Sequence, residues 1–405
     1  MRAVAEFMDI VRGAGALPQV HVIQGPSSEP VVTVDGRQVL LFCSSNYLGL
    51  ATHPEVKQAV ADALWEYGVG ANGSRLVSGT TDLHVTLEQV TAAYKVTEAA
   101  IAFPTGFMAN TGTIPALAYL PYFARMAGLP LESATPQMVV VSDALNHASI
   151  VDGLQAARAK HAYYAHCDLD ALEEKLRQNQ GKRLLIVTDG VFSMDGDIAP
   201  LPGIMSLAKE YGATVLLDDA HATGVLGSTG RGTLEHFGLK GSDDVLQMGT
   251  FSKSFGSLGG FVAGDRSTVD YLRVAARPYV FSGALPPCLA AGIVKAIEIA
   301  VREPQRRVRL MRNRDYLVYG LEDLGFDTLA SETPIVPILV GDDEKAEAMS
   351  LELFERGLYA PCVRWPAVAR GQSRIRLTLM ATHEREHLDR LLEGLADVGR
   401  KFGLV

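Results

Sequence analysis

The chain has 405 residues, of which 48% are hydrophobic and 20% are charged, and its formal net charge is −9. This length and apolar content predict a folded protein with a large core that divides into two domains, and they exclude a disordered chain. The acidic balance argues against binding to nucleic acid or to an anionic membrane over a wide surface. Any phosphate-bearing ligand must therefore be bound by a local pocket.

The sequence carries no sign of secretion, of a membrane span or of a disulfide framework. No apolar run reaches the roughly 18 residues that a transmembrane helix needs, and Glu6 and Asp9 do not fit a signal peptide. The cysteines are far apart and form no C-x-x-C pair, so neither disulfides nor a thiolate metal site is indicated. We expect a cytoplasmic protein without a transmembrane segment. The cysteines are Cys43, Cys167, Cys288 and Cys362.

Short apolar runs alternate with helical patterns between residues 54 and 276. The apolar runs are 99–103, 138–142, 184–188, 214–217, 245–248 and 260–263. Continuous apolar strands separated by helices predict a mostly parallel sheet covered on both faces, with ligands at the carboxyl ends of its strands. Polar residues stand at those ends, namely Asp143, Asp189, Asp218 and Thr250.

A change of pattern after Pro286 and Pro287 predicts a second, smaller domain. A helical stretch over 289–302 leads to strands at 335–340 and 373–379 and to a final helix near 383–402. We therefore expect an N-terminal segment over 1–45, a large domain over 46–284 and a C-terminal α+β domain over 285–405. Residues 118–136 look like an insertion, and the sequence leaves open whether they form a lid, an interface or a packed loop.

One lysine and one aspartate carry the chemical interpretation. Lys253 lies among hydroxyl and glycine residues in Thr250-Phe-Ser-Lys253-Ser-Phe-Gly, and Asp218 ends an apolar run in Leu216-Leu-Asp218-Asp-Ala-His221. A lysine supplies the amine of a Schiff base, a buried carboxylate keeps a pyridine nitrogen protonated, and hydroxyls bind a phosphate. The set predicts pyridoxal 5'-phosphate (PLP) as the cofactor, although a lone lysine is usually a solvated surface charge.

Strand geometry decides between the two adjacent carboxylates. Side chains alternate along a strand, so only one of Asp218 and Asp219 can face the cofactor. We choose Asp218, because this choice leaves His221 able to return beside the cofactor ring. Asp219 is then expected to be a structural hydrogen-bond partner.

The segment Thr105-Gly-Phe-Met-Ala-Asn110 follows an apolar run and opens a helical pattern. The free amides of Gly106 and Phe107 can therefore meet a phosphate at the positive end of a helix. Alone, the segment would be interpreted as a plain strand-to-helix turn. Hydroxyl donors to the phosphate are expected from Thr250, Ser252 and Ser282.

Further side chains are candidates for contacts to the ring and to a substrate. His147 could lie flat on the cofactor ring, although a structural histidine is the better interpretation of this residue alone. Ser193 could hydrogen-bond the phenolate oxygen of the ring or could be a turn serine. Arg374 and Arg376 share one face of a strand, where either could clamp a substrate carboxylate while the other is a surface charge.

Two motifs suggest other chemistry and are set aside. His383-Glu384-Arg-Glu-His387 matches the zinc pattern H-E-x-x-H, but it is highly charged and has no evident third ligand, so we expect no metal. The glycines of residues 224–232 resemble a dinucleotide-binding loop, but no helical pattern opens there. A flexible loop is the better interpretation.

Taken together, these motifs resemble the α-oxoamine synthases, a family of fold-type-I PLP-dependent enzymes. The resemblance runs from about Val39 to the C-terminus, and its motifs follow the family's order. They are Asn46-Tyr-Leu-Gly-Leu50, Gly73-Ser-Arg-Leu-Val-Ser-Gly79, Ser142-Asp-Ala-Leu-Asn-His-Ala-Ser149, Val191-Phe-Ser-Met-Asp-Gly196, Asp218-Asp-Ala-His221, Gly249-Thr-Phe-Ser-Lys253 and Arg374-Ile-Arg-Leu-Thr378. The resemblance implies an α/β fold of type I, with a mostly parallel sheet in the large domain and a smaller C-terminal α+β domain.

The resemblance also assigns roles around the cofactor ring. It implies that Lys253 forms the Schiff base, Asp218 pairs with the ring nitrogen, and His147 stacks on the ring. His221 and Ser193 would contact the ring oxygen. The family reaction is a decarboxylative condensation of an amino acid with an acyl thioester, usually acyl-CoA, that gives an α-aminoketone.

On the substrate side, the resemblance implies that Arg376 holds the amino-acid carboxylate, with Asn46 and Arg364 as further substrate contacts. Family members are homodimers, in which Ser282 would serve the partner's phosphate. Ser45 stands where glycine-using relatives carry Asn, so we lean towards the serine palmitoyltransferase branch. Glycine C-acetyltransferase and 8-amino-7-oxononanoate synthase are alternatives, and the acyl group could arrive on CoA or on a carrier protein. Outside the family, an aminotransferase, an aldolase and a non-enzymatic binding protein stay open.

Overall fold

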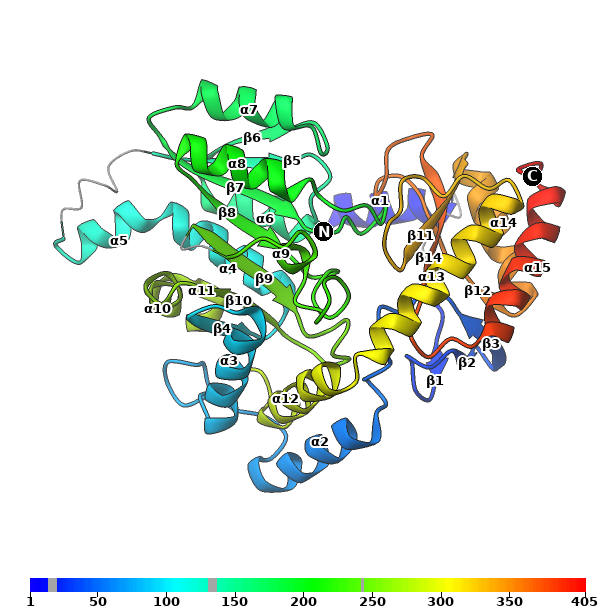
Figure 1. Cartoon of the computed structure of the whole chain (residues 1–405), viewed down its shortest axis with the longest axis horizontal. Coiled ribbons are helices and arrows are strands. Elements are labelled where there is room, and N and C mark those ends of the chain that lie inside the picture. Colours follow the sequence, from blue (N-terminus) through cyan, green and yellow to red (C-terminus); the bar gives the residue numbers. More distant parts are fainter. Residues whose placement is uncertain (14–19, 130–136, 242–243) are drawn as a thin grey trace.

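A seven-stranded sheet lies at the centre of the larger part of the molecule (Figure 1). The computed structural model describes residues 1–13, 20–129, 137–241 and 244–405. In spatial order the strands are β4 (Ala99–Phe103), β10 (Gly260–Gly264), β9 (Val245–Thr250), β8 (Ala213–Asp218), β7 (Arg183–Asp189), β5 (Met138–Asp143) and β6 (Lys160–Tyr164). β10 runs antiparallel to both neighbours, and the strands from β9 to β6 are parallel. The mostly parallel sheet predicted from the apolar runs is confirmed.

Helices cover both faces of this sheet, because successive side chains of a strand point to opposite sides. On one face Val140 packs in a cluster with Ile114 of α4 (Gly106–Ala118), and α6 (Ala148–Ala157), α10 (Arg266–Ala275) and α11 (Arg277–Phe281) belong to the same layer. On the other face Val139 packs in a cluster with Leu172 of α7 (Leu169–Gln178) and Ile204 of α8 (Leu201–Tyr211). The edge strand β6 was not predicted from the sequence, because four of its five residues are not buried and its apolar run is short.

The smaller part contains a three-stranded antiparallel sheet of β11 (Ile335–Gly341), β14 (Ser373–Thr378) and β13 (Cys362–Val363). The helices α13 (Gln305–Asp323), α14 (Asp343–Glu355) and α15 (Arg385–Lys401) surround it (Figure 1). β14 carries the two arginines expected to lie on one face of a strand. β14 contacts the larger part through Arg374, which pairs with Asp195.

A second small sheet joins strands from the first part of the sequence to a short strand from the last part. The strands β1 (Ile23–Gln24), β2 (Val31–Val34) and β3 (Arg37–Leu41) are antiparallel, and β3 continues in parallel with β12 (Leu358–Tyr359). In this pairing Leu40 lies opposite Leu358. The predicted N-terminal segment thus shares a sheet with a strand of the predicted C-terminal domain, and the domain boundaries stay a prediction.

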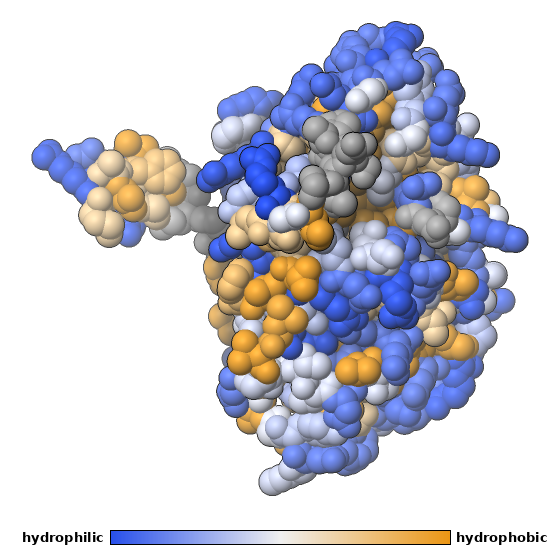
Figure 2. All heavy atoms as spheres, turned by 90° about the vertical axis from the view of Figure 1, so that its left-hand side faces the viewer, coloured by the Kyte–Doolittle hydropathy of each residue, from blue (hydrophilic) through white to orange (hydrophobic). Residues whose placement is uncertain are grey.

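Three longer helices, α2 (Pro54–Tyr67), α3 (Asp82–Lys95) and α12 (Pro287–Arg302), pack beside each other against the main apolar core. Near them, α9 (Thr233–His236) is a single turn. At the N-terminus, α1 (Arg2–Gly13) has no buried residue and stands clear of the rest of the surface (Figure 2). The described part of the predicted insertion is the end of α4 and α5 (Leu120–Met126), and residues 130–136 lie outside the described residues. Within the described ranges, no helix is long and apolar enough to cross a membrane.

Candidate active site

A cavity of about 330 Å³ opens at the carboxyl ends of β7, β8 and β9 and at the first turn of α4. This is the edge where the ligand was expected, because parallel strands direct their carboxyl ends to one side of a sheet. Eight of the predicted site residues line the cavity. They are Gly106, Phe107, His147, Asp218, His221, Thr250, Ser252 and Lys253.

Lys253 follows β9 in a tight loop, and its amine lines the cavity. Burial and the charge of Arg376 lower the pKa of this amine, the charges of Asp218 and Asp189 oppose them, and the net pKa is about 8. The loop needs Gly256, which has φ +63°, and a Cβ there would lie 2.3 Å from the backbone nitrogen of Ala51. At pH 7 roughly a tenth of an amine with this pKa is unprotonated, far more than for an ordinary lysine, and the unprotonated form is the nucleophile.

Asp218 and Asp219 point to opposite sides of the end of β8, as strand alternation predicts. Asp218 faces the cavity, where Oδ2 accepts a hydrogen bond of 2.7 Å from Nδ2 of Asn110 and Oδ1 accepts one of 3.0 Å from the amide of Ala220. Asp219 lies away from it in an ion pair of 2.9 Å with Lys95, and both side chains are 0% exposed. The cavity therefore receives one supported carboxylate from this pair.

A second carboxyl group, Asp189, also lines the cavity and was noted in the sequence only as a strand end. It lies directly opposite Asp218 in the parallel pairing of β7 and β8. Burial, and then the charge of Asp218, raises its pKa well above the ordinary value, and Oδ1 is buried without a partner among the described residues. The direction of this shift favours the protonated form of Asp189.

A hydrogen-bond chain links Asp218 to His147. Nδ2 of Asn110 also bonds Oγ of Ser149 at 2.9 Å, and that oxygen lies 2.7 Å from Nδ1 of His147. The amide of Ser149 donates to the same ring nitrogen, so His147 caps the N-terminus of α6. Burial lowers the pKa of His147, which leaves a neutral ring at the cavity wall.

His221 has a buried partner that the sequence did not reveal. Its Nδ1 lies 2.7 Å from Oη of Tyr47. Burial raises the pKa of Tyr47 to about 12 and lowers that of His221 well below its ordinary value, so a neutral phenol meets a neutral imidazole. Tyr47 also receives hydrogen bonds from Ser45 and Arg376. It therefore donates its proton to Nδ1, and Nε2 of His221 keeps the proton that can reach the cavity.

The far end of the cavity is suited to an anion. The N–H groups of Gly106 and Phe107 lie in the first turn of α4 and have no acceptor within that helix. A Cβ on Gly260 of β10 would lie 2.5 Å from Cα of Gly106, so glycine lets the helix end approach the sheet. Oγ1 of Thr250 lies 2.7 Å from Oγ of Ser252 and donates to the carbonyl of Gly259. Two amides and a hydroxyl pair thus converge where a phosphate would fit.

Five predicted contacts are not among the described residues that line the cavity, namely Asn46, Ser193, Ser282, Arg364 and Arg376. The amide of Asn46 is used inside the protein, where Oδ1 accepts from Leu50 and Nδ2 donates to Ser28. Arg364 pairs with Glu347 on the surface. Oγ of Ser282 donates to the carbonyl of Pro278 at 2.6 Å. The carbonyl oxygen of Ser193 accepts a hydrogen bond of 2.5 Å from Nε of Arg376.

The two arginines of β14 have different surroundings. Arg376 bonds Ser193, Thr378 and Tyr47, and it is not among the residues that line the cavity. Arg374 is not the surface charge that was expected of one arginine, because it is 4% exposed and pairs with Asp195 at 2.6 Å. Sequence periodicity identified the shared face but could not show which partners each guanidinium meets.

The motifs set aside in the sequence have structural partners. Nε2 of His383 bonds the carbonyl of Leu41 at 2.9 Å, and its Nδ1 accepts from the amide of Met380. His387 accepts from the amide of Glu384 at the start of α15, so it serves as a cap. In the glycine-rich loop, Gly227 and Gly230 have positive φ and no long helix follows.

Comparisons with known proteins agree with this geometry. The family described as aminotransferase class I and II matches residues 37–395. The 8-amino-7-oxononanoate synthase of Symbiobacterium thermophilum is 44% identical over 404 residues, which cover 99% of this chain and 98% of the relative. The serine palmitoyltransferase of Sphingomonas wittichii is 32% identical, with a TM-score of 0.90 over 100% of this chain and 98% of the other. A serine palmitoyltransferase structure described with a PLP internal aldimine has 33% identity and a TM-score of 0.89, with 100% and 98% coverage. The chain belongs to the aminotransferase class I and II family and, within it, to the α-oxoamine synthases.

Proposed function

We propose that this chain catalyses the decarboxylative condensation of an amino acid with an acyl thioester, using PLP bound to Lys253. The single observation that carries the proposal is the cavity that brings Lys253, Asp218 and the first turn of α4 together. An amine with a pKa of about 8, a carboxyl group and an amide-rich anion site are the groups that the aldehyde, the pyridine nitrogen and the phosphate of PLP require. The buried but unpartnered Oδ1 of Asp189 also fits a polar ligand in this cavity.

Bound there, PLP would supply the electron sink for negative charge at the α-carbon of the amino acid. Asp218, supported by Asn110 and the amide of Ala220, would hold a proton on the ring nitrogen. The amides of Gly106 and Phe107 would bind the phosphate. His221 would donate a hydrogen bond from Nε2 to the ring oxygen of PLP. The amine of Lys253 would take the proton from the α-carbon of the amino acid and return it.

Arg376 is the cation placed to orient the amino acid. It lies beside Tyr47 and close enough to Lys253 and His221 for its charge to lower the pKa of both. Its guanidinium can present a fork to a carboxylate once the substrate enters. Asn46 and Arg364 receive no support as substrate contacts, because each is engaged elsewhere.

The 44% identical relative favours 8-amino-7-oxononanoate as the product. An amino group on C8 and an oxo group on C7 of this nine-carbon acid indicate alanine as the amino acid and a seven-carbon acyl group with a distal carboxylate. A serine-using, long-chain reaction is the second candidate, because serine palmitoyltransferases share the fold at TM-scores of 0.89 and 0.90. Ser45 beside Tyr47 is the sequence feature that favours it.

We also infer a homodimer with shared active sites in the cytoplasm. Exposed apolar side chains that a partner could cover include Trp65, Val77 and Phe281. Ser282 lies outside its own cavity, as a residue that serves the partner's phosphate would. The four cysteines are free, which is compatible with a reducing compartment.

The test pairs alanine, serine and glycine with short, long and ω-carboxylated acyl-CoAs, and with the same acyl groups on a carrier protein. Free thiol and carbon dioxide are followed together, and products are identified by mass spectrometry. We expect thiol release with one amino acid and the matching α-aminoketone. Release of neither thiol nor carbon dioxide in any pair would reject the proposal, and transamination products would point to an aminotransferase instead.

A further inference from the structure

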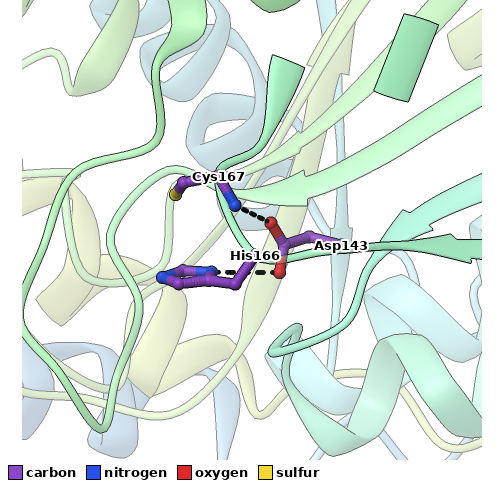
Figure 3. A group of neighbouring side chains, drawn as sticks. All are labelled: Asp143, His166 and Cys167. Carbon is purple, nitrogen blue, oxygen red and sulfur yellow. Dashed lines mark hydrogen bonds and ion pairs between the residues drawn. The ribbon is translucent and has the colours of Figure 1, made fainter. Parts of the chain in front are cut away.

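A histidine outside the cavity contacts two carboxylates, and Figure 3 shows one of them, Asp143, beside His166 and Cys167. His166 lies in the loop between β6 and α7, with Nδ1 3.1 Å from Oδ1 of Asp143 and Nε2 2.9 Å from Oδ2 of Asp197. An ionised carboxylate only accepts hydrogen bonds, so these two contacts require N–H on both ring nitrogens. The geometry therefore makes His166 an imidazolium. Phe192 packs edge-on against the ring, with centroids 4.4 Å apart.

The Asp143 contact fixes the turn that leads to His147. Asp143 is 1% exposed, and its carboxylate also accepts the amides of Leu145 at 2.8 Å and Cys167 at 2.9 Å. In the same turn the side chain of Asn146 accepts from the amide of Asp189. The next residue is His147, which caps α6 and lines the cavity. His166 therefore contacts the start of the turn that ends at His147, although His166 itself is not among the residues that line the cavity.

The Asp197 contact fixes the hairpin over residues 190–199, which carries Ser193 and lines the cavity through Val191. The amide of Phe192 donates to the carbonyl of Asp197 at 3.1 Å and closes this hairpin. On its other side, Arg374 and Arg376 of β14 bond Asp195 and Ser193. The hairpin is therefore bonded by His166 at Asp197 and by the two arginines of β14 at Asp195 and Ser193.

The same residues also suggest a metal site, because Asp143, His166 and Cys167 offer ligand atoms within 4.8 Å of one another. A metal would have to displace a proton from both the imidazole and the thiol. Burial lowers the pKa of His166, but the hydrogen bonds of Asp143 and Asp197 outweigh it and raise the pKa to about 12. Burial raises the pKa of Cys167. Both shifts favour the protonated groups and oppose metal binding.

We propose that His166 is a positioning residue whose ring ties the turn carrying His147 to the hairpin carrying Ser193. Both segments border the cavity, so the link fixes the orientation of the cofactor rather than its attachment. This inference rests on the proposed function, because the cavity is taken to hold PLP. The relevant readout is the asymmetry of bound PLP, which visible circular dichroism measures.

The test compares His166→Asn and His166→Gln with His161→Asn, which changes an exposed histidine of the neighbouring strand β6. Each holoenzyme is measured by visible circular dichroism per bound PLP, by kcat and KM, and by urea unfolding. In the His166 variants we expect the dichroism to fall at least about twofold and kcat to fall about 10²-fold, the size of effect that a misplacement of about 1 Å produces. KM for the amino acid should change less than kcat, and the His161 variant should match the wild type.

Several results would overturn the inference. Unchanged dichroism and kcat with lower stability would make His166 merely structural. Zn²⁺ that binds the wild type but not His166→Asn at micromolar concentration would make the ring a ligand. If the His166 variants do not fold, Asp197→Ala removes the side chain that His166 contacts on the hairpin and keeps the Asp143 contact, and unchanged dichroism in it would be equally decisive. A wild-type protein that binds no PLP would reject the proposed function, and the inference with it.

Discussion

Asp218 and Asp219 are neighbours in sequence but meet different surroundings, so the same substitution should have different effects. Asp218→Asn keeps the shape of the side chain and removes the charge that holds the ring proton, which should lower kcat at least about 10²-fold with little loss of stability. Asp219→Asn leaves Lys95 buried without its counter-charge, which should cost about 3–5 kcal/mol of unfolding free energy. Urea unfolding and steady-state kinetics on both variants check this. A stable but inactive Asp219→Asn protein would reverse the two roles.

The amine of Lys253 should make attachment of PLP to the apoprotein depend on pH in the neutral range. Its pKa is lowered to about 8, so the unprotonated, reactive fraction should rise with pH and level off above pH 8 rather than above the ordinary lysine value. The charge of Asp218 raises this pKa, so Asp218→Asn should move the midpoint to lower pH. Stopped-flow absorbance at several pH values measures the rate. A midpoint near 10 would show an amine without a burial shift.

At the scale of single residues, the sequence could predict contacts between near neighbours but not between distant ones. Alternation along one strand placed Asp218 and Asp219 on opposite sides, because that rule needs only local geometry. Tyr47 was quoted within a motif without a role, since its partner His221 lies 174 positions away and only the fold brings them together. Asn110 was likewise the last residue of a motif whose helix start was recognised. Its bond to Asp218 depends on the packing of α4 against the sheet.

At the scale of elements, the approach of α4 to β10 should control phosphate binding. Gly260→Ala would place a Cβ 2.5 Å from Cα of Gly106, and backbone cannot move aside as a flexible side chain can. We expect a stability loss of about 1–3 kcal/mol from overpacking and weaker binding of PLP, because the amides of Gly106 and Phe107 shift. Gly264→Ala is the control on the same strand, since its Cβ would meet only the end of Leu246. Fluorescence titration with PLP distinguishes the variants, and equal affinities would contradict the role of this contact.

Apolar runs predicted the central strands well because buried parallel strands are apolar on both faces. The edge strand β6 did not follow this rule, since Lys160 and His161 are exposed. The pairing of β3 with β12 joins residues more than 300 positions apart in strands of five and two residues. So short a pair leaves no periodic signal in the sequence. In the hairpin over 190–199 the sequence offered only Ser193, as a ring contact or a turn serine, and the hairpin's contacts with His166 and Arg374 follow from tertiary packing.

At the scale of the whole molecule, the site depends on both parts of the chain. The large sheet supplies the amine, the carboxylates and the anion site, while β14 of the smaller part supplies Arg376 and holds the Ser193 hairpin. A change in the relative position of the two parts would therefore move Arg376, the proposed carboxylate clamp, with respect to Lys253. This arrangement suits a reaction that must admit two substrates in turn.

A shared active site predicts complementation between two inactive proteins. Lys253→Ala lacks the amine, and Ser282→Asp should repel the partner's phosphate, so each homodimer should be inactive. In a mixed dimer, the intact Lys253 of one subunit meets the intact Ser282 of the other at one of the two sites. An unseparated random mixture should then have roughly a quarter of the wild-type activity, and the purified mixed dimer roughly half. Co-expression with two affinity tags and assay of the purified mixed dimer measures this.

Ser267→Asp, on the exposed side of α10, is the matched control for the added charge and should keep full activity by itself. The hydroxyl of Ser282 is bonded to Pro278 and lies outside the cavity of its own chain, as a residue that serves the partner's site would. If each chain completed its own site, Ser282→Asp would stay active and mixing would restore nothing. Complementation therefore separates a shared site from two independent ones, and it does so whichever amino acid and acyl donor the enzyme uses.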